Sequence, residues 1–452
     1  MNRVIFIAAA SMISLGSCSV YRTFEAPEVQ TENIAGVDVK LQDTSADVPS
    51  WRALFVDQQL QALIEKGLES NSDLQIVRLN IEQAEAALTA SKLSYLPSLG
   101  IAAEGGVSKF NGSTTQTYHL PLVTQWELDL FGRIRNSKEQ AKSTLLQSEA
   151  YEQMVQTQLV ASIANGYYTL VMLDDQLNIV RQTIANLKEN LDVIIELKKA
   201  GMQSEAAVNQ ATANYFSVQT SEQDLQKQIK IVENSIALLI NETPHAIRRG
   251  TYNESAPLNI DLEDKISLTA LANRPDVKVA EYNLRRDFYG VNVARAAFYP
   301  SISLGGSAGW TNNVGVVVNP GELLLSAIGS LTQPIFNKGV NRANLKIAHA
   351  QYDQSLISFE KALLVAGNEV NDALTECQSS AAKRILRKHQ ITANEQAVAN
   401  SIELMKHSSA TYLEVLFAQN ALLQSQLEDV SDWFEGVRGN INLYKSLSGG
   451  AN

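Results

Sequence analysis

Apolar residues recur every three or four positions in two segments of the chain, which is the spacing of one face of an α-helix. The segments begin near Asn71 and Arg274. Each runs into a proline, Pro97 or Pro300, which removes a backbone donor and disfavours helical geometry in the residue before it. The sequence therefore predicts two helices that end shortly before these prolines, with apolar stripes formed by Leu74, Val77, Ile81, Ala84 and Leu88 and by Val277, Ala280, Leu284, Phe288 and Val291.

After each proline the pattern changes to a period of two, which is typical of β-strands. Near Pro300, Ile302, Leu304, Ala308 and Trp310 share one parity, whereas serines and glycines occupy the other. We therefore predict four strands, and the apolar parity is a candidate surface to face lipid. The strands are expected at about 98–108, 117–127, 301–311 and 323–332.

Both halves then continue for a long distance without helix breakers. No proline occurs between Arg133 and Thr243, and none occurs from Ile335 to the end. A helix from about Ile134 to Lys199 would be roughly 100 Å long at 1.5 Å per residue, so an elongated molecule is expected. A dimeric coiled-coil rod is an alternative, but the strands have no place in it.

The two halves repeat one order of elements. The segments that begin at Asn71 and Arg274 align with a shift of 203 residues. Phe131 of DLFGR aligns with Phe336 of PIFNKG at a shift of 205, and the last matched motifs align at 207. One duplicated unit with short loop insertions explains this drift.

These matches and the N-terminal features predict a division of the chain into five segments. They are a signal peptide (1–17), an N-terminal segment (18–70), a first repeat (71–243), a linker (244–273), and a second repeat with a C-terminal tail (274–452).

The first residues have the features of a secretory signal peptide. Arg3 precedes an apolar run from Val4 to Leu15, which is too short to span a bilayer as a helix. The run ends in LGSC, which resembles the lipobox of bacterial lipoproteins, in which the cysteine becomes the acylated first residue. We therefore predict lipid attachment at Cys18, and a cleavage site that abuts a cysteine by chance is the alternative.

Composition narrows the class of protein. With 45% hydrophobic and 19% charged residues the chain can bury a large core. A net charge of −11 argues against a nucleic-acid-binding protein, which would present a basic face. Apart from Cys18 the sequence has one cysteine, Cys377, so a mature chain acylated at Cys18 has no internal disulfide. No later apolar run reaches the length of a transmembrane helix, so further contact with the membrane would require the strands.

Strands of about ten residues have the length needed to cross a bilayer. Four of them cannot close a barrel, and an open sheet edge in hydrocarbon is costly, so several chains would have to share the barrel. Two chains would give eight strands and three would give twelve, and the long helices favour the larger ring. Two soluble hairpins are the alternative that the alternation alone does not exclude.

At this point the chain resembles the TolC-like outer-membrane factors, most closely their lipoprotein efflux branch. The resemblance covers nearly all of the mature chain, and its motifs are specific through their order and spacing rather than singly. They are WRALFVDQQLQALIEKGLESNSDL, the YLPS and FYPS turns, WELDLFGR, QPIFNKG, EVNDAL and LYKSLSGG.

The resemblance implies a mainly α fold with a small β part. Three chains would form a homotrimer whose long antiparallel helices build an α-barrel in the periplasm, girdled by a mixed α/β equatorial region. The resemblance implies that the lipidated segment 18–70, the linker 244–273 and the C-terminal tail contribute to this equatorial region. Four transmembrane strands per chain would complete a 12-stranded barrel in the bacterial outer membrane. Such a protein is a passive exit duct of a tripartite efflux system, which works with a periplasmic adaptor protein and an inner-membrane pump, most commonly of the RND type.

The same resemblance implies a gate at the periplasmic tip, at Leu413, Glu414 and Phe417. The lipoprotein branch typically has an aspartate where this chain has Phe417, so a plain aspartate ring is in doubt. A Glu414 ring beside an apolar ring would gate instead, and a helix-pair core is the alternative for Leu413 and Phe417. Adaptor contacts are implied at Gly201, Met202, Gln203, Ser408, Ser409 and Ala410.

Motifs for catalysis are absent from the sequence. It has no phosphate-binding loop, no nucleophile elbow and no His or Cys spacing typical of a metal site, so we expect neither enzymatic activity nor a cofactor. The paired acids Asp174 and Asp175 are expected on a solvated helix face. Two other functions remain open: a type I protein-secretion duct, and a lipid-anchored periplasmic helical protein.

Overall fold

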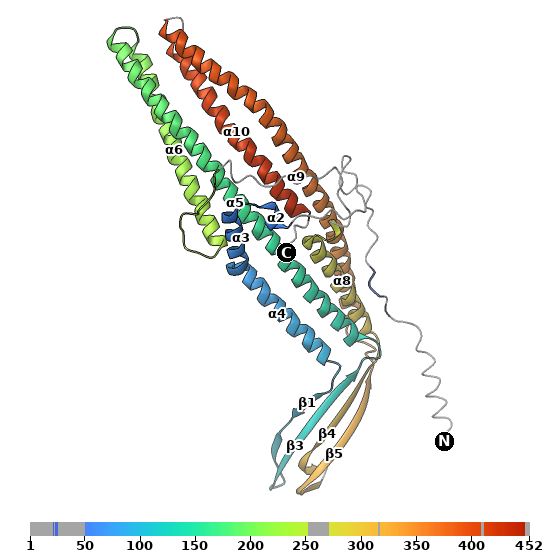
Figure 1. The fold of residues 1–452 in the computed structure, drawn as a ribbon. Helices are drawn as coiled ribbons and strands as arrows, with labels where there is room; N and C mark the ends of the chain where they lie inside the picture. Colours follow the sequence, from blue (N-terminus) through green and yellow to red (C-terminus); the bar gives the residue numbers. More distant parts are fainter. Residues whose placement is uncertain are drawn as a thin grey trace. The chain divides into compact units, whose positions relative to one another are not determined.

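The computed structural model describes residues 21, 23–25, 50–251, 271–314, 317–407 and 411–447, and Figure 1 shows the ribbon. The signal peptide and Cys18 lie outside the described residues. The helices are α2 (Trp51–Leu54), α3 (Gln58–Ser70), α4 (Ser72–Leu93), α5 (Arg133–Lys199), α6 (Glu205–Leu239), α8 (Pro275–Ala296), α9 (Val340–Lys406) and α10 (Tyr412–Ser446). The strands are β1 (Ser98–Ile101), β2 (Glu104–Phe110), β3 (Ser113–Leu128), β4 (Ser301–Val314) and β5 (Val317–Thr332).

The helices of the two repeats have equal lengths. The helices α4 and α8 each contain 22 residues, α5 and α9 each contain 67, and α6 and α10 each contain 35. The starts of α4 and α8 are 203 residues apart, and those of α5 and α9 are 207 apart. All of the inserted residues therefore lie between the first helix and the second, in the strands and their loops.

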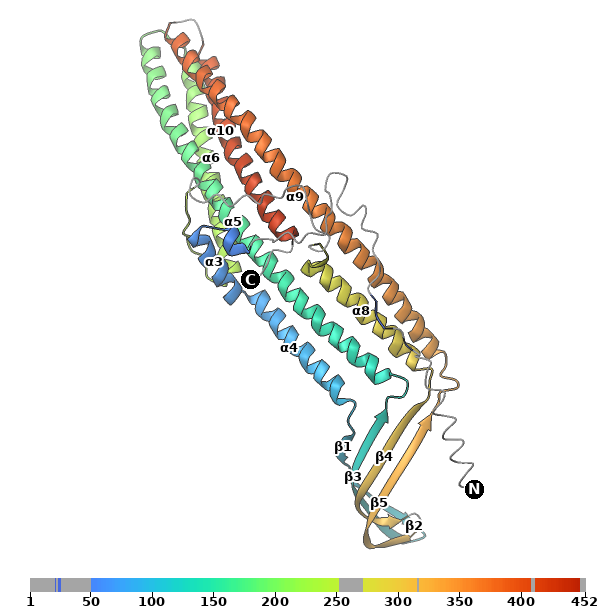
Figure 2. The ribbon, with the colours of Figure 1, turned by 45° about the vertical axis from the view of Figure 1, so that its right-hand side comes forward.

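The strands form one antiparallel sheet in the order β1, β3, β4, β5, and β2 also pairs with β3 (Figures 1 and 2). The strand predicted at 98–108 is divided into β1 and β2, although both parts pair with β3 in one continuous register. The gap between them lies opposite Pro121, which has no N–H to donate and only accepts from the Ala102 N–H at 3.1 Å. The four predicted strands are therefore present, and one of them is interrupted across from a proline.

The first hairpin is longer than the pattern predicted. Its turn consists of Asn111 and Gly112, with φ of 47° and 82°, the positive values that a two-residue type I′ turn requires. Because this turn places Phe110 opposite Ser113, β3 begins four residues before the predicted 117. The Asn-Gly pair was the sequence signal for this turn, and period-two counting alone missed it.

Contacts divide the chain into two units, each built from both repeats. Unit 1 contains residues 1–29, 79–150 and 278–361, and so holds the whole sheet; unit 2 contains 30–78, 151–277 and 362–452. The two repeats therefore do not pack as two separate halves. The segment boundaries given above stay predictions.

The largest core lies in unit 2, around α2, α3 and the middle of α5. Four pairs of aromatic side chains in this core contact each other edge-on or tilted, with ring centroids 5.6 to 6.4 Å apart. Tyr167 links three segments: its hydroxyl donates to Asp57 Oδ2 at 2.5 Å and accepts from the Gly250 N–H at 2.8 Å. The aromatic members are Trp51, Phe55, Tyr167, Tyr168, Trp433 and Tyr444.

Unit 2 also shows how each repeat ties its first helix to its last. In the first repeat the buried Asn71 amide donates to the Leu239 carbonyl at the end of α6, at 2.8 Å. At the matching place in the second repeat, the buried Arg274 donates to the Ser446 carbonyl at the end of α10, at 3.0 Å. Its other donors reach Asp276 and Glu369 at 2.7 and 2.6 Å. Two different side chains therefore make the same helix-end contact.

Candidate functional site

The sheet in unit 1 has one strongly apolar face. Cross-strand partners share a face, so the register places the predicted apolar parity of β4 beside apolar residues of β3 and β5. Many of these side chains are exposed, with Leu325 at 70% and Trp310 at 61%. A face of this kind needs an apolar environment. Its members include Leu99, Ile101, Val107, Leu120, Leu122, Trp126, Leu304, Trp310, Leu323, Leu325 and Leu331.

The opposite face is hollowed and lined largely by serine and glycine. The hollow has a volume of about 550 Å³. Across it, Ser303 and Ser330 share a hydrogen bond between their hydroxyl oxygens at 2.6 Å, and Ser307 and Ser326 share one at 2.7 Å. Val123 and Ile328 also line the hollow, so this face is mixed, with small polar side chains in the majority. A mainly polar face opposite a strongly apolar one is the division expected of a strand that separates water from lipid.

Both lateral edges of the sheet lack a strand partner among the described residues. One edge is formed by β1 and β2, and the other by β5. Unpaired backbone groups along a strand edge are a template for another strand. One chain therefore presents an incomplete sheet.

The predicted gate residues lie near the start of α10, in unit 2, and face away from the local core. Tyr412, Val415 and Leu416 are buried against α5 and α6. In contrast, Leu413 and Phe417 are 42% and 66% exposed, and Glu414 is also exposed. Leu413 and Phe417 are therefore not core residues of a helix pair in this chain. Their role in gating stays a prediction.

The loop between α5 and α6 contains the first three predicted adaptor residues. Gly201 has a φ of 74°, and the Gly201 and Met202 N–H groups donate to the Lys198 and Leu197 carbonyls at 2.9 Å. This arrangement is a Schellman cap, so the glycine has a local structural reason. Met202 is 61% exposed beside it. The other predicted adaptor residues, Ser408, Ser409 and Ala410, lie outside the described residues.

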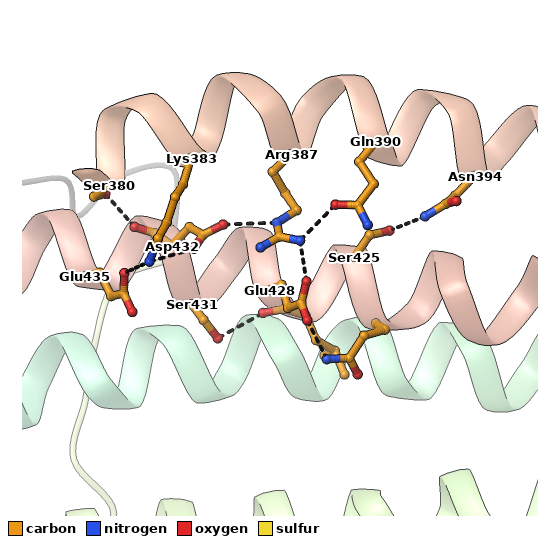
Figure 3. A network of polar contacts seen from close by, with 12 residues as sticks. Ser380, Lys383, Arg387, Gln390, Asn394, Ser425, Glu428, Ser431, Asp432 and Glu435 are labelled. Atoms are coloured by element: carbon orange, nitrogen blue, oxygen red, sulfur yellow. Dashed lines mark hydrogen bonds and ion pairs between the residues drawn. The ribbon is translucent and has the colours of Figure 1, made fainter. Parts of the chain in front are cut away.

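A polar network joins α9 to α10 and was not foreseen from the sequence (Figure 3). Arg387 donates to Asp432 at 3.0 Å and also pairs with Glu428, while the Ser380 hydroxyl donates to the Asp432 carbonyl at 2.6 Å. Lys383 pairs with Glu435 at 2.7 Å. Ser380 and Asp432 are only 2% and 5% exposed, whereas the side chains of Arg387 and Lys383 are 20% and 46% exposed. The seam is therefore charged and has a buried centre at Asp432.

The first repeat has apolar side chains at five of the positions in this network. A shift of 207 residues equates Arg387 with Val180, which is 1% exposed in the contact between α5 and α6. The copies therefore use opposite chemistry at one seam, and aligning them at this shift would have revealed it. Ser380, Arg387, Asn394, Ser425 and Asp432 correspond to Leu173, Val180, Leu187, Val218 and Leu225.

The expected solvated acids Asp174 and Asp175 have two different environments. Arg249, from the segment after α6, donates to both oxygens of Asp174 at 2.6 and 2.8 Å and to Glu233 at 2.9 Å. Burial opposes ionisation of Glu233, but the hydrogen bonds from Arg249 and Lys230 outweigh it and lower its pKa. Burial, together with the charge of Asp429, raises the pKa of Asp175. Arg249 thus fastens the inter-repeat segment to α5 and α6.

Within the described residues, no group of three or more His, Cys, Asp or Glu side chains is arranged to hold a metal ion. Over the same residues, no helix combines the length and the apolar character needed to cross a membrane.

Comparisons with known proteins agree with this architecture. A family model described as "Outer membrane efflux protein" matches residues 63–242 and 267–447, one match in each repeat. The cation efflux system protein CusC of Escherichia coli K12 is 28% identical over 97% of each chain, and the antibiotic efflux pump outer membrane protein ArpC of Pseudomonas putida is 27% identical over all of this chain and 96% of its own. A crystal structure of CusC has a TM-score of 0.85 at 27% identity, covering 96% of this chain and all of that one.

Proposed function

We propose, from the premise that this chain belongs to the outer membrane efflux protein family, that three copies of it form one passive duct through which small molecules leave the cell. The fold is that of outer-membrane channels, mainly helical with a small sheet, and the chain is an outer-membrane efflux protein. The observation that carries the proposal is the incomplete sheet. It has an apolar outer face, a hollow lined by serine and glycine, and two open edges.

A ring of three chains satisfies all of these features together. Pairing the open edges removes unpaired backbone groups from hydrocarbon. Three chains supply twelve strands, which is enough for a barrel with a water-filled interior rather than one filled by side chains. The serine and glycine hollows of the three sheets would then line the lumen, and the apolar faces would contact lipid.

We assign no catalytic chemistry and no cofactor to the duct, since family members act as channels. Its cargo would be selected by the proteins that feed it. CusC is named for cation efflux and ArpC for antibiotic efflux, although both share this architecture. The partners we propose are a periplasmic adaptor protein and an inner-membrane pump of the RND class. The adaptor would contact Gly201, Met202, Gln203 and residues 408–410.

We also propose that Cys18 carries the lipid anchor. Tyr21, three residues later, packs over Gly132 in unit 1, where a Cβ would come within 2.6 Å of the Tyr21 ring. Gly132 lies between the end of β3 and the start of α5. Tyr21, the described residue nearest to the anchor in the sequence, therefore lies at the end of the strands, the level at which acyl chains would enter the bilayer.

Substitution of the cysteine tests the anchor directly. In cells given labelled palmitate, Cys18→Ala should abolish incorporation into the protein, because the thioether can no longer form. Cys377→Ser serves as the matched control and should label as the parent does. Continued labelling of Cys18→Ala would refute the anchor.

Native mass spectrometry and bilayer recording test the duct itself. The full chain, extracted in detergent, should have the mass of three copies and should conduct ions across a planar lipid bilayer. A protein that is monomeric and needs no detergent would contradict the channel and favour a periplasmic structural protein. In cells that lack the gene, drug and metal susceptibility should rise while the secreted proteins stay unchanged; loss of a secreted protein instead would favour a secretion duct.

A further inference from the structure

The contact between the two repeats inside one chain provides a template for the contact between chains. In a ring of three chains, six copies of the repeat follow one another. Copy one meets copy two within a chain, and copy two must then meet copy one of the next chain. If the six copies are equivalent, the contact between the two repeats inside a chain predicts, residue by residue, the contact between neighbouring chains. This inference rests on the proposed trimer.

The equivalence of residues is fixed by a contact that both copies make. In the first copy the Trp126 indole N–H donates to the Tyr95 carbonyl at 2.9 Å. In the second copy Gln333 Nε2 donates to the Phe298 carbonyl at 3.0 Å. Tyr95 and Phe298 are 203 residues apart, and Trp126 and Gln333 are 207 apart. The shift is therefore 203 before each hairpin and already 207 where the hairpin ends.

This alignment corrects the sequence match of Phe131 with Phe336 at a shift of 205. Gly132 and Gly339, both with positive φ, are the equivalent residues before α5 and α9. Phe336 therefore takes the position of Asp129. The two aromatic residues are similar in sequence but occupy different places.

We propose that the β5 edge of one chain pairs antiparallel with the β1–β2 edge of the next, in the register that β3 and β4 show inside the chain. Thr124 lies opposite Gly306 and Leu128 opposite Ile302 within the chain. Applying the two shifts places Leu331 opposite Ala103 of the neighbouring copy. It likewise places Ile335 opposite Leu99 of that copy, so β5 is extended by three residues when it is paired.

The faces of the sheet support this register. Leu331 lies on the apolar face, since it is opposite Ile302, and Ala103 is two residues beyond Ile101 on that face. A slip by one residue would place an apolar side chain of one strand beside a polar one of the other. The register also explains why Ile335 is 97% exposed in one chain, since it would continue the apolar face beside Leu99, itself 70% exposed.

The helices that adjoin the sheet offer a second template of the same kind, because a helix contact inside the chain predicts a helix contact between chains. Inside the chain α5 covers α8, where Asn292 Nδ2 donates to Asn136 Oδ1 at 3.1 Å and both side chains are buried. The equivalent helices for the next contact are α9 and α4, and their facing residues are exposed in one chain. A Cβ at Gly290 would lie 3.2 Å from Gln140, and these positions correspond to Ala87 and Ile347, the latter 54% exposed. We therefore expect Ile347 to cover Ala87 of the neighbour.

Cysteine cross-linking tests the register. Opposite positions on antiparallel strands are within reach of a disulfide, whereas positions two residues out of register are about 7–8 Å apart and are not. In a Cys377→Ser background, Leu331→Cys with Ala103→Cys, and separately Ile335→Cys with Leu99→Cys, should give covalent dimers and closed trimers after oxidation and full denaturation. The slipped control, Leu331→Cys with Ile101→Cys, should give at least about tenfold less.

Each alternative has its own result, read beside native mass spectrometry of the same samples. A trimer in which the slipped control cross-links and the matched pairs do not would overturn the register and leave the duct standing. A covalent dimer from Leu331→Cys alone would mean that β5 edges pair with each other, which also overturns it. A monomeric parent would overturn both proposals. If one matched pair impairs assembly, the other decides.

Discussion

At the scale of single residues, the start of α10 shows how one helix presents two surfaces. The first turns of α10 bury Tyr412, Val415 and Leu416, which fixes the helix against α5 and α6. The positions between them, Leu413 and Phe417, are exposed because an α-helix turns neighbouring side chains to different faces. A residue exposed in one chain can therefore be buried or can line a lumen in the assembly.

We expect the pair Glu414→Ala with Phe417→Ala to raise single-channel conductance in planar bilayers. Removing three carboxylates and three phenyl rings would widen and neutralise a constriction. Lys406→Ala, which changes an exposed side chain on the neighbouring helix, is the control and should leave conductance unchanged. Unchanged conductance in the double variant would remove both residues from the gate.

At the scale of elements, the two helix pairs differ in what holds them together. The seam between α5 and α6 is apolar, and that between α9 and α10 has Arg387 and Asp432 at equivalent positions. Buried charges are costly to desolvate, so such a pair is weak evidence for stability, but it penalises any displaced register strongly. The polar seam thus specifies how α9 and α10 align.

For the polar seam, we expect Asp432→Leu to destabilise the protein by about 1–3 kcal/mol, since the partly buried Arg387 loses one of its two carboxylate partners. Adding Arg387→Val, which copies the first repeat, should recover most of this loss because no buried charge remains on that side. The apparent midpoint of thermal unfolding at fixed protein concentration measures both steps. Additive losses in the double variant would contradict the coupling of the two residues.

The tether formed by Arg249 predicts a dependence of stability on pH. The pKa of Glu233 is lowered from its ordinary 4.5, so its contribution is complete above that value and is lost as the pH falls through the lower, folded-state pKa. We expect Glu233→Gln to be less stable than the parent at pH 7 and to lose less stability between pH 5 and pH 3. Thermal unfolding across this range provides the measurement. If the unfolding temperature of the two proteins fell equally steeply with pH, carboxylates other than Glu233 would be responsible for the loss of stability in acid.

At the scale of the whole molecule, the two faces of the sheet should respond differently to the same kind of change. Leu325→Lys places a charge on the apolar face and should reduce the yield of folded trimer, since such a charge costs about 2–4 kcal/mol near the middle of a bilayer. Ser307→Asp changes the hollow face and should keep the trimer while shifting ion selectivity towards cations. Native mass spectrometry and reversal potentials measure these effects, and Ser307→Asn is the neutral control. If Leu325→Lys changed ion selectivity and Ser307→Asp reduced the yield of trimer, the apolar face would line the lumen and the assignment of the two faces would be wrong.

Much of this architecture could be predicted from local pattern. Period and proline placement located the helices to within a few residues and the strands to within six, because side-chain direction repeats at 3.6 and 2.0 residues whatever the partner is. The duplication and the family resemblance supplied the outer-membrane fold, which the comparisons confirm. Two local features changed the predicted strands. The Asn111-Gly112 turn lengthened the first hairpin, and Pro121 interrupts the strand opposite it between β1 and β2.

The sequence by itself determined which segments are helix and which are strand, which parity of each strand is apolar, and that the chain contains one unit twice. Only the tertiary structure decided which residues of distant segments meet. Arg249 with Asp174, Arg387 with Asp432, and the helix-end contacts of Asn71 and Arg274 join residues that no local period relates. Such contacts depend on how far one helix is shifted along its neighbour. Local periodicity does not specify this shift, because it is set by side-chain packing in the folded chain.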